Sequence, residues 1–175
     1  MTLIQHKFLS HFISKETELL VIGTFNPNSK DNPAEFFYGR IRNYLWRLLP
    51  IAFGEEDLKN KSVVEKINFI QKHKIDFIDL IKEVDVDCET NYDDTYIDNK
   101  VSEWRDIIGE LQKLKAIKKV CFTRKSTTDI PNMKKRIDEV QKFCEANEID
   151  FKYLVTPARF YNLNKQNIWN QLPIK

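Results

Sequence analysis

The stretch 19–50, LLVIGTFNPNSKDNPAEFFYGRIRNYLWRLLP, decides the fold of this chain. It opens with a short apolar run at 19–22, which contains β-branched residues and is bounded by polar turn residues. This pattern predicts a buried strand. Gly23 ends the strand, and a loop rich in amides, aromatics and arginines follows. We interpret the stretch as a pocket built at the carboxyl end of a central strand.

Charge is unevenly distributed along the sequence. Arg40, Arg42 and Arg47 lie in a stretch without any acid, whereas residues 83–98 contain carboxylates and no Lys or Arg. Asymmetry of this kind can mark a side of the molecule that faces phosphates. The alternative is chance clustering on a solvated surface.

Bulk composition indicates one domain, residues 1–175, with ordinary globular character. Hydrophobic residues make up 42% of the 175 residues, and the net charge of +2 gives no indication of a strongly charged partner. The three cysteines form no C-x-x-C pair, and the histidines are not at metal-ligand spacing. No signal peptide and no apolar run of about 18 residues is present. We therefore expect a soluble, cytoplasmic protein without a metal site.

Apolar periodicity predicts alternating strands and helices after the first strand. We expect residues 1–18 to be a lead-in segment, with Phe8, Phe12 and Ile13 on the sheet edge, and residues 82–100 to be a long acidic loop. Ser62 and Glu65 have the spacing of a capping box. The remaining predicted elements are helices at 41–53, 62–73, 102–114 and 132–147, a short helix from 164, and strands at 75–81, 117–123 and 151–155.

Alternation of strands and helices favours an α/β fold with a mostly parallel four-stranded sheet. Right-handed crossovers would point all four strands the same way, so their carboxyl ends would face one crevice. Four segments would then surround a single site: 23–28, the loop after 81, 123–126 and 156–161.

The order of motifs resembles that of a known enzyme family. The motifs are Gly-Thr-Phe-Asn-Pro at 23–27, Phe-Tyr-Gly at 37–39, Arg-Asn-x-x-Trp-Arg-Leu-Leu at 42–49, Ile-Asp-Phe-Ile-Asp-Leu-Ile at 75–81, Lys-Lys-Val-Cys-Phe-Thr at 118–123 and Thr-Pro-Ala-Arg at 156–159. Together they resemble the uracil-DNA glycosylase superfamily, and most closely its DNA-deoxyinosine (hypoxanthine-DNA) glycosylase-like branch. The resemblance runs in order over roughly residues 17–172.

The resemblance implies a three-layer α/β/α sandwich and hydrolysis of the N-glycosidic bond of a deaminated base, uracil or hypoxanthine. It implies DNA containing a damaged base as the partner, with no metal, no cofactor and no membrane, and we expect a monomer. The first motif carries an extra Asn26, and the last motif lacks the usual Ser-Thr-Ser before Pro157. These departures leave open an alternative, a catalytically silent nucleic-acid-binding or nucleotide-binding module on the same fold.

Two asparagines are the candidates for catalysis. Asn43 matches the asparagine that the branch is thought to use, and an amide oxygen can align a water for attack on the sugar. The alternative is that Asn43 caps the start of a helix. Asn26 is the second candidate, with a turn residue before Pro27 as its alternative.

A flipped base needs stacking partners and polar groups, and the phosphates need cations. Arg159 would contact a phosphate or fill the space left by the flipped base, and a surface ion pair is its alternative. Asp79 would be a polar site residue or cap the following loop. The base-binding candidates are Gly23, Thr24, Phe25, Phe37, Tyr38 and Asp79. The DNA-binding candidates are Arg42, Thr156, Pro157, Ala158 and Arg159.

Overall fold

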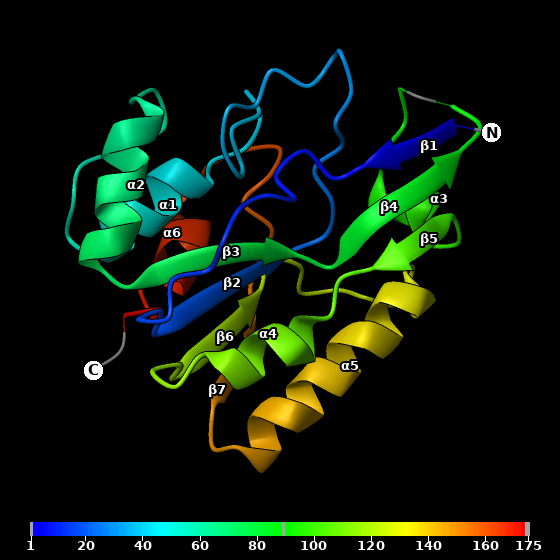
Figure 1. Cartoon of the computed structure of the whole chain (residues 1–175). Coiled ribbons are helices and arrows are strands. Elements are labelled where there is room, and N and C mark those ends of the chain that lie inside the picture. Colours follow the sequence, from blue (N-terminus) through cyan, green and yellow to red (C-terminus); the bar gives the residue numbers. More distant parts are fainter. Residues whose placement is uncertain (1, 89, 174–175) are drawn as a thin grey trace.

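A four-stranded parallel sheet forms the centre of the molecule (Figure 1). The computed structural model describes residues 2–88 and 90–173. The strands lie in the order β3-β2-β6-β7, and all neighbours are parallel. Their bounds are β2 Leu19–Gly23, β3 Ile75–Asp79, β6 Lys119–Phe122 and β7 Asp150–Tyr153. The predicted α/β class and parallel sheet are confirmed.

Helices cover both faces of this sheet, as the three-layer sandwich requires (Figure 1). Leu19 and Val21 point into the core beneath one group of helices, and Leu20 and Ile22 point into the other core. This follows from the two-residue period of a strand that is buried on both sides. The first face carries α1 Leu45–Ala52, α2 Val63–Lys72 and α6 Leu163–Trp169, and the second carries α4 Ile107–Lys113 and α5 Pro131–Ala146.

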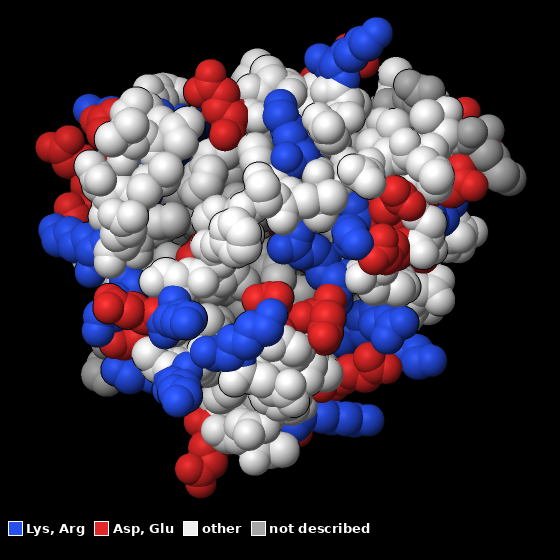
Figure 2. Space-filling view, viewed as in Figure 1, with Lys and Arg blue, Asp and Glu red and all other residues white. Residues whose placement is uncertain are grey.

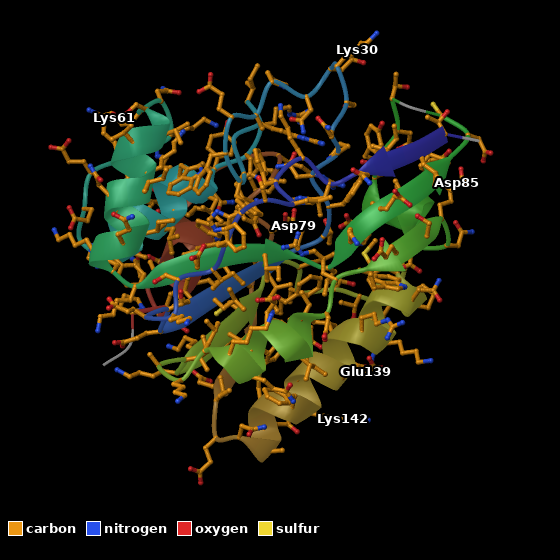
Figure 3. All side chains as sticks on the ribbon, viewed as in Figure 1. Lys30, Lys61, Asp79, Asp85, Glu139 and Lys142 are labelled. Carbon is orange, nitrogen blue, oxygen red and sulfur yellow. The ribbon has the colours of Figure 1, made fainter. Side chains whose placement is uncertain are left out.

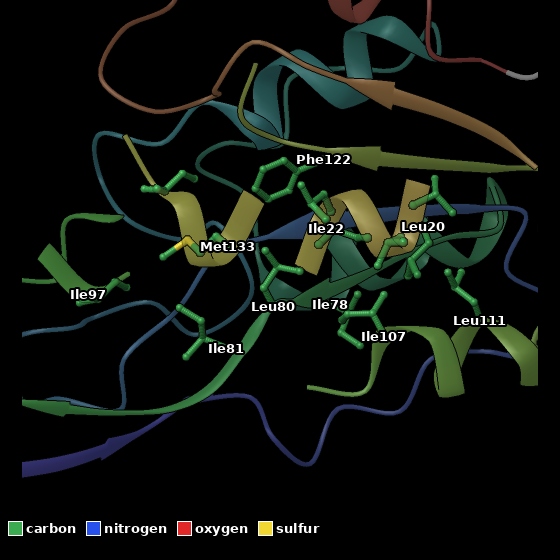
Figure 4. Packing of buried hydrophobic residues seen from close by; sticks show 14 of the residues in the cluster. Leu20, Ile22, Ile78, Leu80, Ile81, Ile97, Ile107, Leu111, Phe122 and Met133 are labelled. Carbon is green, nitrogen blue, oxygen red and sulfur yellow. The ribbon is translucent and has the colours of Figure 1, made fainter. Parts of the chain in front are cut away.

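The core on the α4 and α5 side is continuous with the start of a second sheet. Figure 4 shows Leu20, Ile22 and Phe122 of the central sheet packed against Met133 of α5 and Leu111 of α4. Further along, the same cluster takes in residues that follow β3, so one apolar core joins the two sheets. This packing fixes the position of the chain where it leaves the carboxyl end of β3.

A three-stranded antiparallel sheet, β1-β4-β5, corrects several sequence predictions. Its strands are β1 Thr2–Gln5, β4 Ile81–Val86 and β5 Val101–Trp104. The stretch 82–100 is therefore not one acidic loop, since it contains most of β4 and the short helix α3 Asp94–Ile97. The predicted helix at 102–114 begins as a strand, and the predicted strand at 75–81 is divided between two sheets.

Other boundaries also differ from the sequence predictions. Residues 41–44 precede the first helix instead of belonging to it, and Ile41 is 82% exposed. Phe12 does not pack on the sheet edge, because 90% of its surface is accessible to solvent. The capping box is confirmed, because Ser62 and Glu65 exchange side-chain and backbone hydrogen bonds at the start of α2. Gly54 ends α1 with a φ of 75°, which suits glycine.

Charges of both signs are mixed over the face shown in Figure 2. This view shows no broad surface of one sign. Within the described residues, no helix has the length and apolar character needed to cross a lipid bilayer.

Candidate active site

Polar side chains converge above Gly23, at the carboxyl ends of β2 and β3. Gly23 is the register partner of Asp79 in the parallel pair. A Cβ on Gly23 would lie 2.2 Å from Asp79 Oδ1 and 2.7 Å from the Tyr38 hydroxyl oxygen. Only glycine allows these two side chains to approach the backbone so closely. Asp79 lies in the interior, among the loops at the end of β3 (Figure 3).

Asp79 is paired with His6, a residue that sequence analysis did not single out. His6 Nε2 lies 2.7 Å from Asp79 Oδ2, and the two residues are only 2% and 6% exposed. The backbone N–H of Phe8 donates to His6 Nδ1 at 3.0 Å. Nδ1 is therefore an acceptor, so Nε2 carries the ring hydrogen and donates it to the carboxylate. Asp79 serves this buried pair and has no hydrogen bond to the loop it was expected to cap among the described residues.

Tyr38 contributes its hydroxyl to the same place. Its φ of 56° lies in the left-handed region, and its hydroxyl oxygen lies 3.2 Å from Thr123 Oγ1. Thr123 donates to the Ile22 carbonyl at 3.2 Å, so it accepts the hydrogen of Tyr38. Burial, and next the negative charge of Asp79, raises the pKa of Tyr38 well above its ordinary value. Tyr38 is therefore a neutral phenol in this site.

Phe25 and Tyr92 lie beside this group of side chains, and the exposed Arg40 follows Tyr38 on the same loop. Desolvation lowers the pKa of Arg40, while Asp79 and Tyr92 favour its charged form. The Phe25 ring lies 5.9 Å from the His6 ring and 6.1 Å from the Tyr92 ring, measured between centroids. Thr24, the neighbour of Phe25, accepts a backbone hydrogen bond from Ile81 at 3.1 Å.

Phe37 lies beneath the site, inside the core. Its ring is 2% exposed and stacks on Phe77 at a centroid distance of 5.8 Å. The indole N–H of Trp46 donates to the Phe37 carbonyl at 2.7 Å. These contacts make Phe37 a core residue and leave Phe25 and Tyr38 as the aromatic candidates nearer the surface.

The side chain of Asn26 holds the loop that follows β2. Its Oδ1 accepts a hydrogen bond from Asn32 Nδ2 at 2.5 Å, and the same Asn32 nitrogen donates to the Pro27 carbonyl at 2.7 Å. The Asn26 carbonyl accepts from the backbone of Lys7 at 2.8 Å. This buried residue therefore has the structural role of a turn residue, whatever else it does.

Asn43 occupies the approach to α1. Its Oδ1 accepts from the backbone N–H of Leu45 at 3.0 Å, one of the N–H groups that a helix start leaves free. Its carbonyl accepts from Lys59 Nζ at 2.9 Å. Tyr44 is the N-cap of α1 and makes no side-chain cap, so Asn43 stands one position before the cap while still binding a backbone N–H of the first turn, in partial agreement with the capping alternative. The second lone pair of its amide oxygen is not used by these contacts.

A short antiparallel ladder joins the segments 42–44 and 157–159. Asn43 and Ala158 form a bridge, flanked by hydrogen bonds from Tyr44 N–H to the Pro157 carbonyl at 2.9 Å and from Arg159 N–H to the Arg42 carbonyl at 2.7 Å. The segments that carry the third and the last motif therefore lie side by side, as the prediction of a single site requires.

Two exposed arginines flank this ladder, and a buried lysine supports it. Arg42 and Arg159 are exposed, and the φ of 77° at Arg159 turns the chain away from the ladder. Lys165 Nζ supports the turn by donating to the Ala158 carbonyl at 2.9 Å. Thr156 Oγ1 accepts from the backbone N–H of Ala158 at 3.2 Å.

Two surface cavities lie outside the candidate site. One of about 290 Å³ is bounded by residues 151–154 of β7 and its continuation and by residues of α6, and one of about 260 Å³ lies between α4 and α5. Neither is lined by Gly23, Tyr38 or Asp79. Within the described residues, no cluster of three or more His, Cys, Asp or Glu side chains could hold a metal ion.

The fold and the site define an α/β sandwich with a polar site at the strand carboxyl ends. This architecture is similar to the solution NMR structure of a Methanosarcina acetivorans protein provisionally named a uracil DNA glycosylase, with a TM-score of 0.62 and 19% sequence identity over 91% of each chain. At this identity the likeness shows a shared uracil-DNA-glycosylase-like fold. No family model matches the sequence. No curated protein matches it either.

Proposed function

We propose that this protein is a DNA glycosylase that hydrolyses the N-glycosidic bond of a deaminated base, uracil or hypoxanthine. The observation that carries the proposal is that two groups of residues follow the carboxyl ends of strands in one parallel, glycosylase-like sheet. These are the polar group above Gly23, at the end of β2, and the ladder that pairs Asn43 with Ala158, beyond the end of β7. The protein would act as a monomer on cytoplasmic DNA.

The base would be flipped out of the duplex before cleavage. Phe25 and Tyr38 would stack on it, and a stacked base gains about 1–3 kcal/mol. Gly23, Thr24 and Asp79 would contact its edge. Phe37 would support this surface from the core instead of stacking on the base, because its ring is already covered.

Asn43, with Asn26 as the second candidate, would align the attacking water. Each amide oxygen accepts one hydrogen bond within the protein and keeps a second lone pair. An amide is a weak base, which suffices if the bond breaks before the water has fully attacked. The water oxygen would bond to the anomeric carbon, the base would leave with the electrons of the C–N bond, and a water proton would pass to solvent.

The ladder supplies the surface for the DNA backbone. Arg42 and Arg159 are exposed on neighbouring segments, and an arginine can bind a phosphate through two hydrogen bonds. Thr156, Pro157 and Ala158 would bring this surface against the strand that carries the flipped base. Both arginines would then act by charge, so binding would weaken with added salt.

A catalytically silent nucleic-acid-binding module on the same fold is the second candidate. The observation that favours it is that both catalytic candidates already hold backbone or loop structure through their amide oxygens. Such a module would keep the DNA-binding surface and lack cleavage.

An abasic-site assay separates the two candidates. We expect the protein to generate abasic sites in single strands or duplexes that contain uracil or hypoxanthine, with xanthine tested in parallel. Gly23→Ala places a methyl group against Asp79 and Tyr38, so it should lose the activity in the same purification. That variant is also the control for a contaminating glycosylase. Salt-dependent DNA binding without cleavage of any substrate would establish the silent module instead.

A further inference from the structure

Two His–Asp pairs tie the N-terminal segment to β3, one of them fully buried and the other partly buried. His11 Nε2 lies 2.5 Å from Asp76 Oδ1, and His6 Nε2 lies 2.7 Å from Asp79 Oδ2. Asp76 stands near the start of β3 and Asp79 stands at its end. The two pairs therefore have the same chemistry at opposite ends of one strand.

The carboxylate of Asp76 is fully occupied by the protein. Its Oδ1 also accepts from the backbone N–H of Phe77 at 2.9 Å, and its Oδ2 accepts from the backbone N–H of Ser14 at 2.9 Å. Both oxygens therefore serve to attach the N-terminal segment to the strand. The hydrogen bonds of Asp76 are therefore all accounted for by a structural role.

The carboxylate of Asp79 keeps one oxygen for another partner. Oδ2 is taken by His6, but no described residue donates a hydrogen bond to Oδ1, which lies against Gly23 at the place where a Cβ would be 2.2 Å away. Oδ1 is not among the fully buried side-chain atoms of the described residues that lack a partner, so solvent or a ligand can reach it. The Oδ1 atom is therefore positioned for a hydrogen-bond donor that comes from outside the chain.

The neighbouring groups define which donor fits. The Tyr38 hydrogen points to Thr123, so its oxygen also offers lone pairs beside Asp79. Arg40 is an exposed residue that offers only donors, and the same carboxylate favours its charged form. The site thus presents acceptors at its floor, and Arg40 is the cationic side chain that Asp79 influences.

We propose that Asp79 reads the ring N–H of a lactam edge, the N–H beside a carbonyl, and that His6 is the positioning residue that orients the carboxylate. Arg40 would meet the carbonyl. This inference rests on the proposed function only for the identity of the ligand as a nucleobase. Uracil and hypoxanthine both carry the lactam edge, whereas cytosine and adenine place a ring nitrogen acceptor and an amino group there. The floor would therefore separate deaminated bases from the two bases that give rise to them.

Binding of free bases tests this reading without any cleavage step. Hypoxanthine and adenine are similar in size and differ in this edge, so their dissociation constants are compared by calorimetry on the wild-type protein. We expect hypoxanthine to bind at least about tenfold more tightly, since an unpaired buried carboxylate costs that much. We also expect 1-methylhypoxanthine, which lacks the N–H, to lose the advantage. Equal affinities for hypoxanthine and adenine, or no binding of either base, would overturn the inference.

Variants of the two pairs supply the matched controls. Asp79→Asn should bring the hypoxanthine-to-adenine ratio close to one, because an amide can present a donor or an acceptor. His6→Ala should lower the ratio, and His6→Gln, which can still donate to Asp79, should restore part of it. His11→Gln breaks the equivalent structural pair and should leave the ratio unchanged. An unchanged ratio in Asp79→Asn would remove Asp79 from recognition.

Nitrogen NMR of the His6 ring gives a readout that a merely structural role would not move. We expect a protonated Nε2 whose resonance shifts when hypoxanthine is added, while the His11 ring does not respond. A His6 signal that ignores a bound base would contradict its positioning role. If the free bases are discriminated but no substrate is cleaved, the recognition site stands and the glycosylase proposal fails.

Discussion

At the scale of single residues, hydrogen bonds made inside the protein separate the candidate side chains. Asn43 supports the start of α1 and Asn26 holds a loop, whereas Asp79 keeps an oxygen that nothing in the described chain uses. The same residue type can therefore be structural or functional according to the partners that remain for it. Each residue needs a test that measures stability and function separately.

Asn43 can be tested with two substitutions. Asn43→Ala removes the acceptor for the Leu45 N–H, so we expect the free energy of unfolding to fall by about 1 kcal/mol. Asn43→Ser can still accept that hydrogen bond and should retain most of the stability. If Asn43 aligns the water, both variants lose cleavage in the abasic-site assay. Full cleavage by the serine variant would exclude a catalytic role for Asn43 and show that it only stabilises the start of α1.

The raised pKa of Tyr38 predicts that the folded protein loses stability at high pH. Burial and the charge of Asp79 raise its pKa, so the folded state keeps a proton that the unfolded state releases above about pH 10. The free energy of unfolding should therefore fall as pH rises from about 10 towards the pKa of the folded protein. Urea denaturation at several pH values measures this slope, and Tyr38→Phe should make it shallower. An equal slope in the variant would show that Tyr38 does not titrate in this way.

Sequence reasoning identified part of this site and missed His6. Gly23 and Asp79 could be found because they end apolar strands, and the ends of parallel strands meet at one edge of a sheet. His6 directly follows the four-residue strand β1, forms a single bridge to Pro27, and reaches Asp79 across 73 positions of the sequence. No local pattern carries that information.

At the scale of elements, the buried strands were predictable and the half-buried ones were not. β2 is a continuous apolar run, β3 combines Ile and Phe with two aspartates, and every residue of both strands is buried. In β4 the buried positions Ile81, Val84 and Val86 alternate irregularly with charged residues, and the register shifts twice against β5. The acidic composition of this segment therefore predicted a loop. It is a strand because it pairs with β1 and β5, which are distant in the sequence.

The capping box of α2 is an element whose contribution can be measured alone. Ser62→Ala removes the acceptor for the Glu65 N–H, so we expect the free energy of unfolding to fall by about 1 kcal/mol. Ser102→Ala is the control, since Ser102 is an exposed strand residue bonded only to Glu83. It should change stability by less than about 0.5 kcal/mol. Urea denaturation with an unchanged m-value measures both, and equal losses would contradict the capping role.

At the scale of the whole molecule, the arginines that approach the ladder and the arginine of α5 lie on opposite sides of the central sheet. The segments that carry Arg42 and Arg159 contribute Tyr44 and Tyr161 to the core beneath α1 and α6, whereas Arg136 belongs to α5, on the other face of the sheet, and lies over Trp104. Net charge is small, so the sequence total does not reveal which side binds DNA. The proposed DNA-binding side can be identified only from the fold, because the fold brings the segments 42–44 and 157–159 together.

The salt dependence of DNA binding tests that surface. Arg159→Ala should weaken binding and reduce the slope of log K against log salt by about 0.9, the contribution of one phosphate contact. Arg136→Ala changes the net charge equally on the other side of the sheet and should leave the slope unchanged. Fluorescence anisotropy over a range of salt concentrations gives both slopes. A smaller slope in Arg136→Ala than in Arg159→Ala would place the contact on α5.

The pairing of His6 with Asp79 also sets an order for biosynthesis. The two residues are separated by 73 positions, so the histidine leaves the ribosome long before its carboxylate exists as part of a strand. During that interval the amino-terminal segment has no sheet on which to settle, and closing so long a loop slows folding. The recognition floor can therefore form only once residue 79 has been synthesised and β3 has paired with β2.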